Sequence, residues 1–85
     1  MSRQSRVEAL VGVLLATREG ATKMRVMYEQ GITASQATEC LSFLRISGFV
    51  KREEGTNVFR PTEKGISLLE DYERLSEEIG WRITA

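Results

Sequence analysis

The stretch from Gly31 to Gly65 (GITASQATECLSFLRISGFVKREEGTNVFRPTEKG) constrains the fold of this chain more than any other segment. Near its start, Thr33 and Gln36 form a T-x-x-Q capping box, in which each side chain satisfies a free backbone amide of the other residue. Apolar residues then recur at helical spacing until Gly48, a residue type that commonly ends helices. The pattern predicts a helix over residues 34–47.

A short β-hairpin is expected directly after this helix, over residues 49–61. Two strand candidates, Phe49–Glu53 and Asn57–Pro61, flank a turn that Gly55 supplies. The basic side chains of this hairpin are Lys51, Arg52 and Arg60.

A long final helix follows the hairpin. Thr62 is its expected N-cap, and Glu63 places a favourable negative charge in the first turn. We expect the helix to run to about Ile79, where Gly80 ends it. At ~1.5 Å per residue its length is roughly 25 Å.

The apolar residues of the final helix divide into two sets. Ile66 and Leu69 are expected to return to the core of the domain. The others have coiled-coil spacing and form an apolar seam, defined as Leu68, Tyr72, Leu75 and Ile79. We interpret this seam, extended by Trp81, as the interface of a homodimer. The alternative is that the first helix of the same subunit packs against it.

Two shorter helices are predicted ahead of Gly31. Ser5 and Glu8 form an S-x-x-E capping box that starts a helix reaching about Thr17. Thr22 is a plausible N-cap for a second helix that stops at Gly31. The whole chain, residues 1–85, therefore reads as one small domain. Its predicted fold is mainly α with a small β-hairpin: a winged helix-turn-helix over 5–61 and a C-terminal dimerisation helix over 62–80.

The charge distribution is more informative than the net charge, which is zero. Residues 1–52 carry eight basic and four acidic side chains, whereas residues 53–85 carry four basic and eight acidic ones. A protein with one basic end can bind phosphate there while the acidic end faces away. Ordinary scatter of surface charge is the alternative.

The predicted fold assigns DNA-binding roles to the polar face of helix 34–47 and to the hairpin. Short polar side chains allow a helix to approach a groove closely, and Gln, Ser and Arg can bond to base edges. Lysine and arginine on a wing contact phosphates without reading sequence. The expected base or groove contacts are Gln36, Thr38, Ser42 and Arg45. The expected phosphate contacts are Lys23, Arg25, Ser35, Lys51, Arg52 and Arg60.

Other functions find little support in the sequence. The chain has no histidine, and Cys40 is its only cysteine. We therefore expect no metal, no cofactor, no internal disulfide and no enzymatic activity. Cys40 falls on the apolar face of its helix and is expected to pack as a small hydrophobe. No membrane span or leader is apparent, so we expect a cytoplasmic, nucleoid-associated protein.

A series of short motifs resembles the small archaeal winged-helix proteins. The motifs are GATKMRVMY (Gly20–Tyr28), SQ (Ser35–Gln36), LSFL (Leu41–Leu44), GFV (Gly48–Val50) and TEKG (Thr62–Gly65). The resemblance implies a winged helix with a C-terminal antiparallel coiled coil, in proteins that bind DNA as regulators or chromatin components. A viral or plasmid-borne member fits equally well. The chain departs from the family pattern at Ala37, Cys40 and Arg60, where leucine, tyrosine and an apolar residue are usual.

Two functions follow as hypotheses. The first is a homodimeric double-stranded DNA-binding protein, either a transcriptional regulator or a chromatin-type binder. The second is a winged-helix module that binds another protein and no DNA, which Glu39 and the two glutamates of the hairpin would suit.

Overall fold

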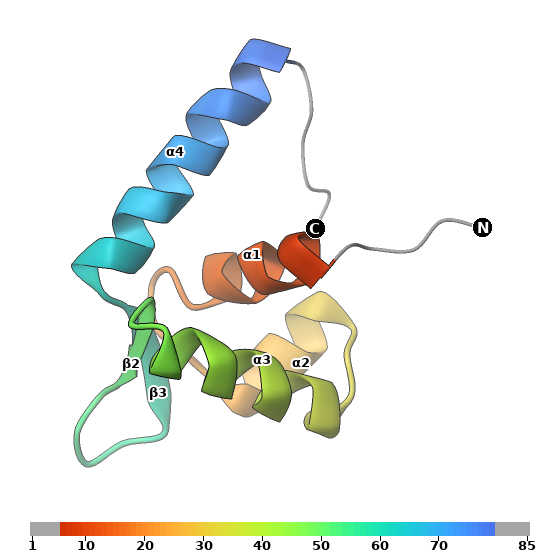
Figure 1. Cartoon of the computed structure of the whole chain (residues 1–85). Helices are drawn as coiled ribbons and strands as arrows, with labels where there is room; N and C mark the ends of the chain where they lie inside the picture. Colours follow the sequence, from red (N-terminus) through yellow and green to blue (C-terminus); the bar gives the residue numbers. More distant parts are fainter. Residues whose placement is uncertain (1–5, 80–85) are drawn as a thin grey trace.

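The computed structural model describes residues 6–79, which form four helices and three strands (Figure 1). In chain order the elements are α1 (Arg6–Ala16), β1 (Ala21–Thr22), α2 (Lys23–Gln30), α3 (Ala34–Ile46), β2 (Val50–Arg52), β3 (Val58–Pro61) and α4 (Glu63–Ile79). The predicted class and the predicted order of helices and hairpin are confirmed. The expected N-cap Ser5, the stop at Gly80 and the expected interface residue Trp81 lie outside the described residues.

The caps predicted for α2 and α3 are present. The Thr22 hydroxyl accepts a hydrogen bond from the backbone amide of Arg25 at 3.2 Å. At the start of α3, the Thr33 hydroxyl accepts from the Gln36 amide at 3.1 Å, and the Gln36 side chain accepts from the Thr33 amide at 2.9 Å. These bonds satisfy amides that a helix leaves unpaired at its N-terminus, so both helices start where the sequence indicates.

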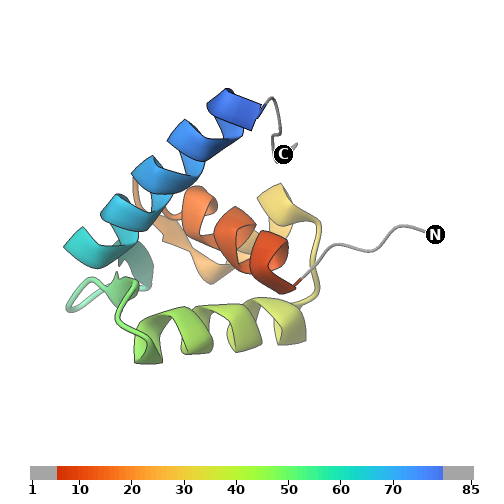
Figure 2. The ribbon, with the colours of Figure 1, turned by 45° about the horizontal axis from the view of Figure 1, so that its top comes forward.

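The core lies where α1, α2 and α3 pack together beside the sheet. In both views α1 lies between α4 and α3, and α4 rises from the edge of the sheet (Figures 1 and 2). Val13 and Leu14 of α1 and Val26 of α2 are fully buried at the centre. The remaining buried members of the cluster are Val11, Ala21, Leu41, Leu44, Val50 and Leu69.

The sheet has one strand more than the hairpin that was predicted. Its order is β1-β3-β2, with both pairings antiparallel. Ala21 pairs with Phe59 and Thr22 with Val58, so the segment before α2 covers the outer edge of the hairpin. Two residues are too few for the alternation of apolar and polar side chains that marks a strand, which is why the sequence did not indicate β1.

The end of α3 is tied to the start of α4. Gly48 has φ +85°, and the Phe49 amide donates to the Leu44 carbonyl at 2.8 Å, the arrangement of a Schellman cap. Two carbonyls just beyond the helix, those of Ser47 and Gly48, accept hydrogen bonds from side chains at the start of α4. The Thr62 hydroxyl donates to the Gly48 carbonyl at 2.6 Å, and the Lys64 ammonium donates to the Ser47 carbonyl at 2.9 Å.

One expectation for α4 is wrong. Ile66 was expected in the core but is 44% exposed, while Leu69 is buried as expected. The stripe of α4 that packs onto the core runs through Gly65, Leu69 and Tyr72, at spacings of four and three residues. Ile66 comes one residue after Gly65, about 100° around the helix, and therefore points to the side of this stripe.

Some residues of the apolar seam of α4 pack against the core, and others are exposed. Leu68 and Tyr72 are half-buried and pack against the core of their own subunit, whereas Leu75 is 51% exposed. The side chain of Ile79 is not described. An ion pair also joins α4 to the segment after α1, with Arg18 Nη1 at 2.6 Å from Glu73 Oε2. The assignment of the seam to a dimer interface stays a prediction.

Replacing Gly65 with alanine tests the contact between α4 and the start of β2. An added Cβ would overlap the carbonyl oxygen of Phe49, which belongs to the backbone and cannot move aside cheaply. We expect Gly65→Ala to lower the free energy of unfolding by about 1–3 kcal/mol, measured by urea denaturation. In an uncrowded helix the same change would stabilise by up to ~1 kcal/mol. Ser67→Ala, on the exposed side of the same helix, is the control. A stabilised Gly65→Ala variant would contradict the close contact.

Candidate nucleic-acid interface

Helix α3 presents one face to the core and a polar face to solvent. Ala37, Leu41 and Leu44 are buried, and Cys40 is half-buried beside them, as the sequence indicates. The exposed residues of the other face include Ser35, Thr38, Glu39, Ser42 and Arg45. This exposed face is the one on which the sequence places most of its expected base contacts.

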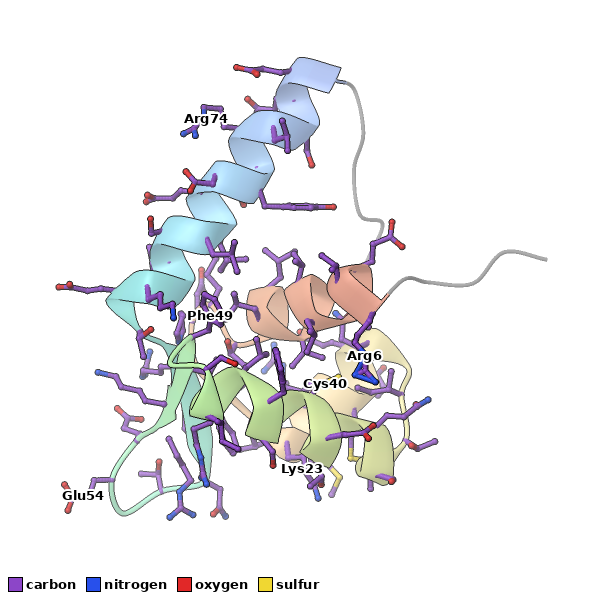
Figure 3. The ribbon with its side chains drawn as sticks, viewed as in Figure 1. Arg6, Lys23, Cys40, Phe49, Glu54 and Arg74 are labelled. Atoms are coloured by element: carbon purple, nitrogen blue, oxygen red, sulfur yellow. The ribbon has the colours of Figure 1, made fainter. Side chains whose placement is uncertain are left out.

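Lys23 connects α2 to this polar face. Its ammonium donates a hydrogen bond to the Thr38 hydroxyl at 3.0 Å, and Figure 3 shows Lys23 beside α3. Lys23 is also the first residue of α2, where a positive charge opposes the helix dipole. A phosphate bound at this point would be attracted by both the lysine and the N-terminal amides of α2.

Two neighbouring recesses extend the polar face of α3 toward the sheet. One lies between α3 and β3, and the other between the start of α2 and the hairpin; Lys23 and Phe59 line both. We call the two recesses together the basic groove. Its other lining residues are Thr22, Met24, Thr38, Leu41, Ser42, Arg45, Arg52 and Asn57. The structure therefore brings together five of the residues that the sequence assigned to DNA: Lys23, Thr38, Ser42, Arg45 and Arg52.

Three further predicted residues bind partners within the chain. Arg25 donates to Glu29 at 2.7 Å, a bond that raises the pKa of the arginine, and it lines a different recess beside the end of α1. Arg60 donates to Glu53 at 3.3 Å. The side-chain oxygen of Gln36 is occupied by the capping box. These contacts occupy hydrogen-bonding groups that the three side chains would otherwise present to a ligand, although all three residues are exposed.

Ser35 and Lys51 are exposed outside the basic groove. Ser35 lies at the N-terminal end of α3, and Lys51 lies in β2, paired with Arg60 of β3. Both remain candidate phosphate contacts at the margins of the polar face.

The sequence interpretation missed the apolar members of the basic groove. Phe59 was assigned to a strand, and its place between α2 and α3 depends on β1 pairing with β3. Met24 was placed in the second helix without a role; it is exposed and lines the recess near Arg52. Only the pairing of β1 with the hairpin, which the sequence did not reveal, places these residues together.

Negative charge concentrates on α4, away from the basic groove. Of the charged residues in α4, only Lys64 and Arg74 are basic; the acidic ones are Glu63, Glu70, Asp71, Glu73, Glu77 and Glu78. In both views the C-terminal half of α4 and helix α3 lie on opposite sides of the molecule (Figures 1 and 2). The acidic residues in the C-terminal half of α4 are therefore separated in space from α3.

Cys40 behaves as a packed hydrophobe rather than a reactive group. Burial raises the pKa of its thiol, and the neighbouring Glu39 carboxylate raises it further, while Arg6 acts in the opposite direction (Figure 3). The thiolate is the reactive form of cysteine, so this environment disfavours redox or nucleophilic chemistry. Among residues 6–79, the His, Cys, Asp and Glu side chains form no group that could hold a metal ion. No helix in this part of the chain is long and apolar enough to cross a membrane.

The polar face of α3, the helix-turn-helix formed by α2 and α3, and the hairpin beside them define a winged helix-turn-helix. The winged helix-turn-helix family matches residues 3–80, and the chain belongs to this family. No curated protein sequence matches the chain.

Two solved structures show the same fold. Both are of a doubly substituted variant of ZitR from Lactococcus lactis, one of them in an apo form. The apo structure has a TM-score of 0.71 and 15% identity, covering 87% of this chain and 60% of ZitR. The other also has a TM-score of 0.71 and 15% identity, covering 91% of this chain and 56% of ZitR. The chain thus spans less than two thirds of the ZitR chains.

Proposed function

We propose that the chain is a homodimeric, double-stranded DNA-binding protein that acts as a transcriptional regulator or chromatin-type binder. In this proposal α3 enters the major groove, and the wing, residues 49–61, follows the phosphate backbone. The observation that carries the proposal is the basic groove, in which Lys23 of α2 lines both recesses, Arg45 of α3 lines one and Arg52 of β2 lines the other. The resemblance of the sequence motifs to small archaeal DNA-binding proteins supports it. Such a protein would act in the cytoplasm, on the nucleoid.

The proposed DNA contacts fall into two classes, contacts to base edges and contacts to phosphates. Arg45, Ser42 and Thr38 stand on the exposed face of α3 and would meet base edges. Cations at the margins of this face would meet phosphates, which supply affinity that depends on salt. We assign this second role to Lys23, Lys51 and Arg52 first, because Arg25 and Arg60 are already paired with glutamates.

The proposed dimer forms through α4. Leu75 is a large apolar side chain that is 51% exposed, and it lies next to the half-buried Leu68 and Tyr72 along the apolar seam. A second copy packed on this seam would cover apolar surface that the subunit alone leaves in water. The two copies of α3 would then contact successive major grooves if the dimer places them ~34 Å apart.

Binding to duplex DNA across a salt series is the first test of this proposal. A random-sequence duplex and the duplex upstream of the protein's own coding sequence would be compared, with the oligomeric state measured in the same buffers. We expect a dimer whose affinity falls steeply with salt. Each phosphate that the protein neutralises contributes about −0.9 to the slope of log affinity against log salt concentration. Preference for the upstream duplex would indicate a regulator, and equal affinity a chromatin-type binder. An absence of binding at low salt would refute the proposal and favour a protein-interaction module.

Arg45→Ala tests how α3 contacts the duplex. If Arg45 bonds to guanine in the groove, its loss should weaken binding to the preferred duplex by about 1–3 kcal/mol and relax the preference at one base pair. Arg74→Ala removes an exposed arginine from α4, where it pairs with Asp71, and should leave binding unchanged. Equal losses on all duplexes would show that Arg45 contacts phosphate. No loss on any duplex would remove this part of α3 from the interface.

Leu75→Lys tests the dimer. A lysine in the seam would place an unpaired charge in an apolar interface, which disfavours association. We expect this variant to sediment as a folded monomer at concentrations where the unmodified chain is a dimer. Ser67→Lys adds the same charge to an exposed position of α4 outside the seam and should remain dimeric. A dimeric Leu75→Lys variant would place the interface elsewhere.

A further inference from the structure

Ile46 is a large apolar side chain at the C-terminal end of the polar face of α3. Ser35, Glu39, Ser42 and Ile46 follow one another at spacings of four, three and four residues, so they form one stripe along the helix. This stripe is opposite the buried residues Ala37 and Leu41. Ile46 is its only apolar member and is 84% exposed.

Packing within the subunit does not account for this isoleucine. Ile46 is absent from the core cluster and from the half-buried residues that pack against it, whereas its neighbour Leu44 is buried. The proposed dimer does not account for it either. The C-terminal half of α4, which carries Leu75, lies on the opposite side of the molecule from α3 in both views (Figures 1 and 2).

The charges that surround the stripe indicate what covers Ile46. Arg45 precedes it in the chain and, together with Lys23, lines the recess between α3 and β3. Cations along one side of an exposed helix face are complementary to a phosphate backbone that borders a DNA groove. An apolar side chain beside these cations would meet the floor of the groove, where the C5 methyl group of thymine is the apolar feature.

We infer that Ile46 reads the C5 methyl group of thymine in the major groove. This inference rests on the proposed function and adds a specificity determinant to it. The polar residues of α3 would bond to base edges, and Ile46 would select thymine at the position it covers by burying the methyl group. Uracil presents the same hydrogen-bonding groups as thymine but lacks the methyl group. A difference in affinity between duplexes that contain thymine and duplexes that contain uracil therefore reports contact with the methyl group rather than polar contacts.

The test compares two synthetic 30-base-pair duplexes of alternating sequence, one of adenine and thymine and one of adenine and uracil. Affinities would be measured by fluorescence anisotropy at one fixed salt concentration for the 85-residue chain. We expect the thymine duplex to bind more tightly by about fourfold for each methyl group contacted. Ile46→Ala should bind the two duplexes equally. This variant should fold normally because the side chain it removes is exposed.

Ile66→Ala is the matched control. Ile66 is also an exposed isoleucine, at 44% exposure, but it belongs to α4 and does not line the basic groove. This variant should keep the preference for thymine. Equal binding of both duplexes by the unmodified chain would overturn the inference and leave the proposed function standing. A preference for thymine that persists in Ile46→Ala would assign methyl readout to another residue. Failure to bind either duplex at low salt would overturn the proposed function as well.

Discussion

The bonds between the end of α3 and the start of α4 determine how the rest of the molecule is arranged. The Schellman cap already pairs the Leu44 and Arg45 carbonyls of α3 with the backbone amides that follow it, which leaves the next carbonyls along the chain to find other partners. Here the Thr62 hydroxyl and the Lys64 ammonium bond to carbonyls just beyond α3. Lys64 also lies 4.6 Å from the centre of the Phe49 ring, a cation–π contact. The TEKG motif thus fixes the helix that carries the polar face relative to the helix that carries the apolar seam.

Local signals made most of the fold predictable. Capping boxes and glycine stops act over three or four residues, so Thr33, Gln36 and Gly48 could be assigned from sequence alone. Features that depend on tertiary pairing could not. Strand β1 exists because Ala21 and Thr22 meet the far edge of the hairpin. The side of α4 that becomes buried is likewise decided by where the core lies.

The polar face of α3 was predictable from the sequence, but the full set of residues that line the candidate site was not. Helical periodicity identified the exposed polar residues of α3, because burial and exposure alternate with the turn of the helix. The same reasoning treated every cation near that face as available. The structure shows that Arg60 and Arg25 are paired with glutamates. The Arg25–Glu29 pair has the i,i+4 spacing that a helix brings together, whereas the Arg60–Glu53 pair depends on how the hairpin folds. The structure also adds Phe59, whose position depends on the three-stranded sheet.

The hydrogen bond between Lys23 and Thr38 has a further consequence for how the polar face can bind. The lysine is the donor in this bond, so the Thr38 oxygen accepts and its own proton remains available to point outward. Thr38 is therefore set to act as a donor toward an acceptor such as a phosphate oxygen or the O4 atom of thymine. Both side chains are also held before a ligand arrives. Immobilising a flexible side chain costs about 0.5–1.5 kcal/mol on association, and preorganisation of this pair reduces that cost.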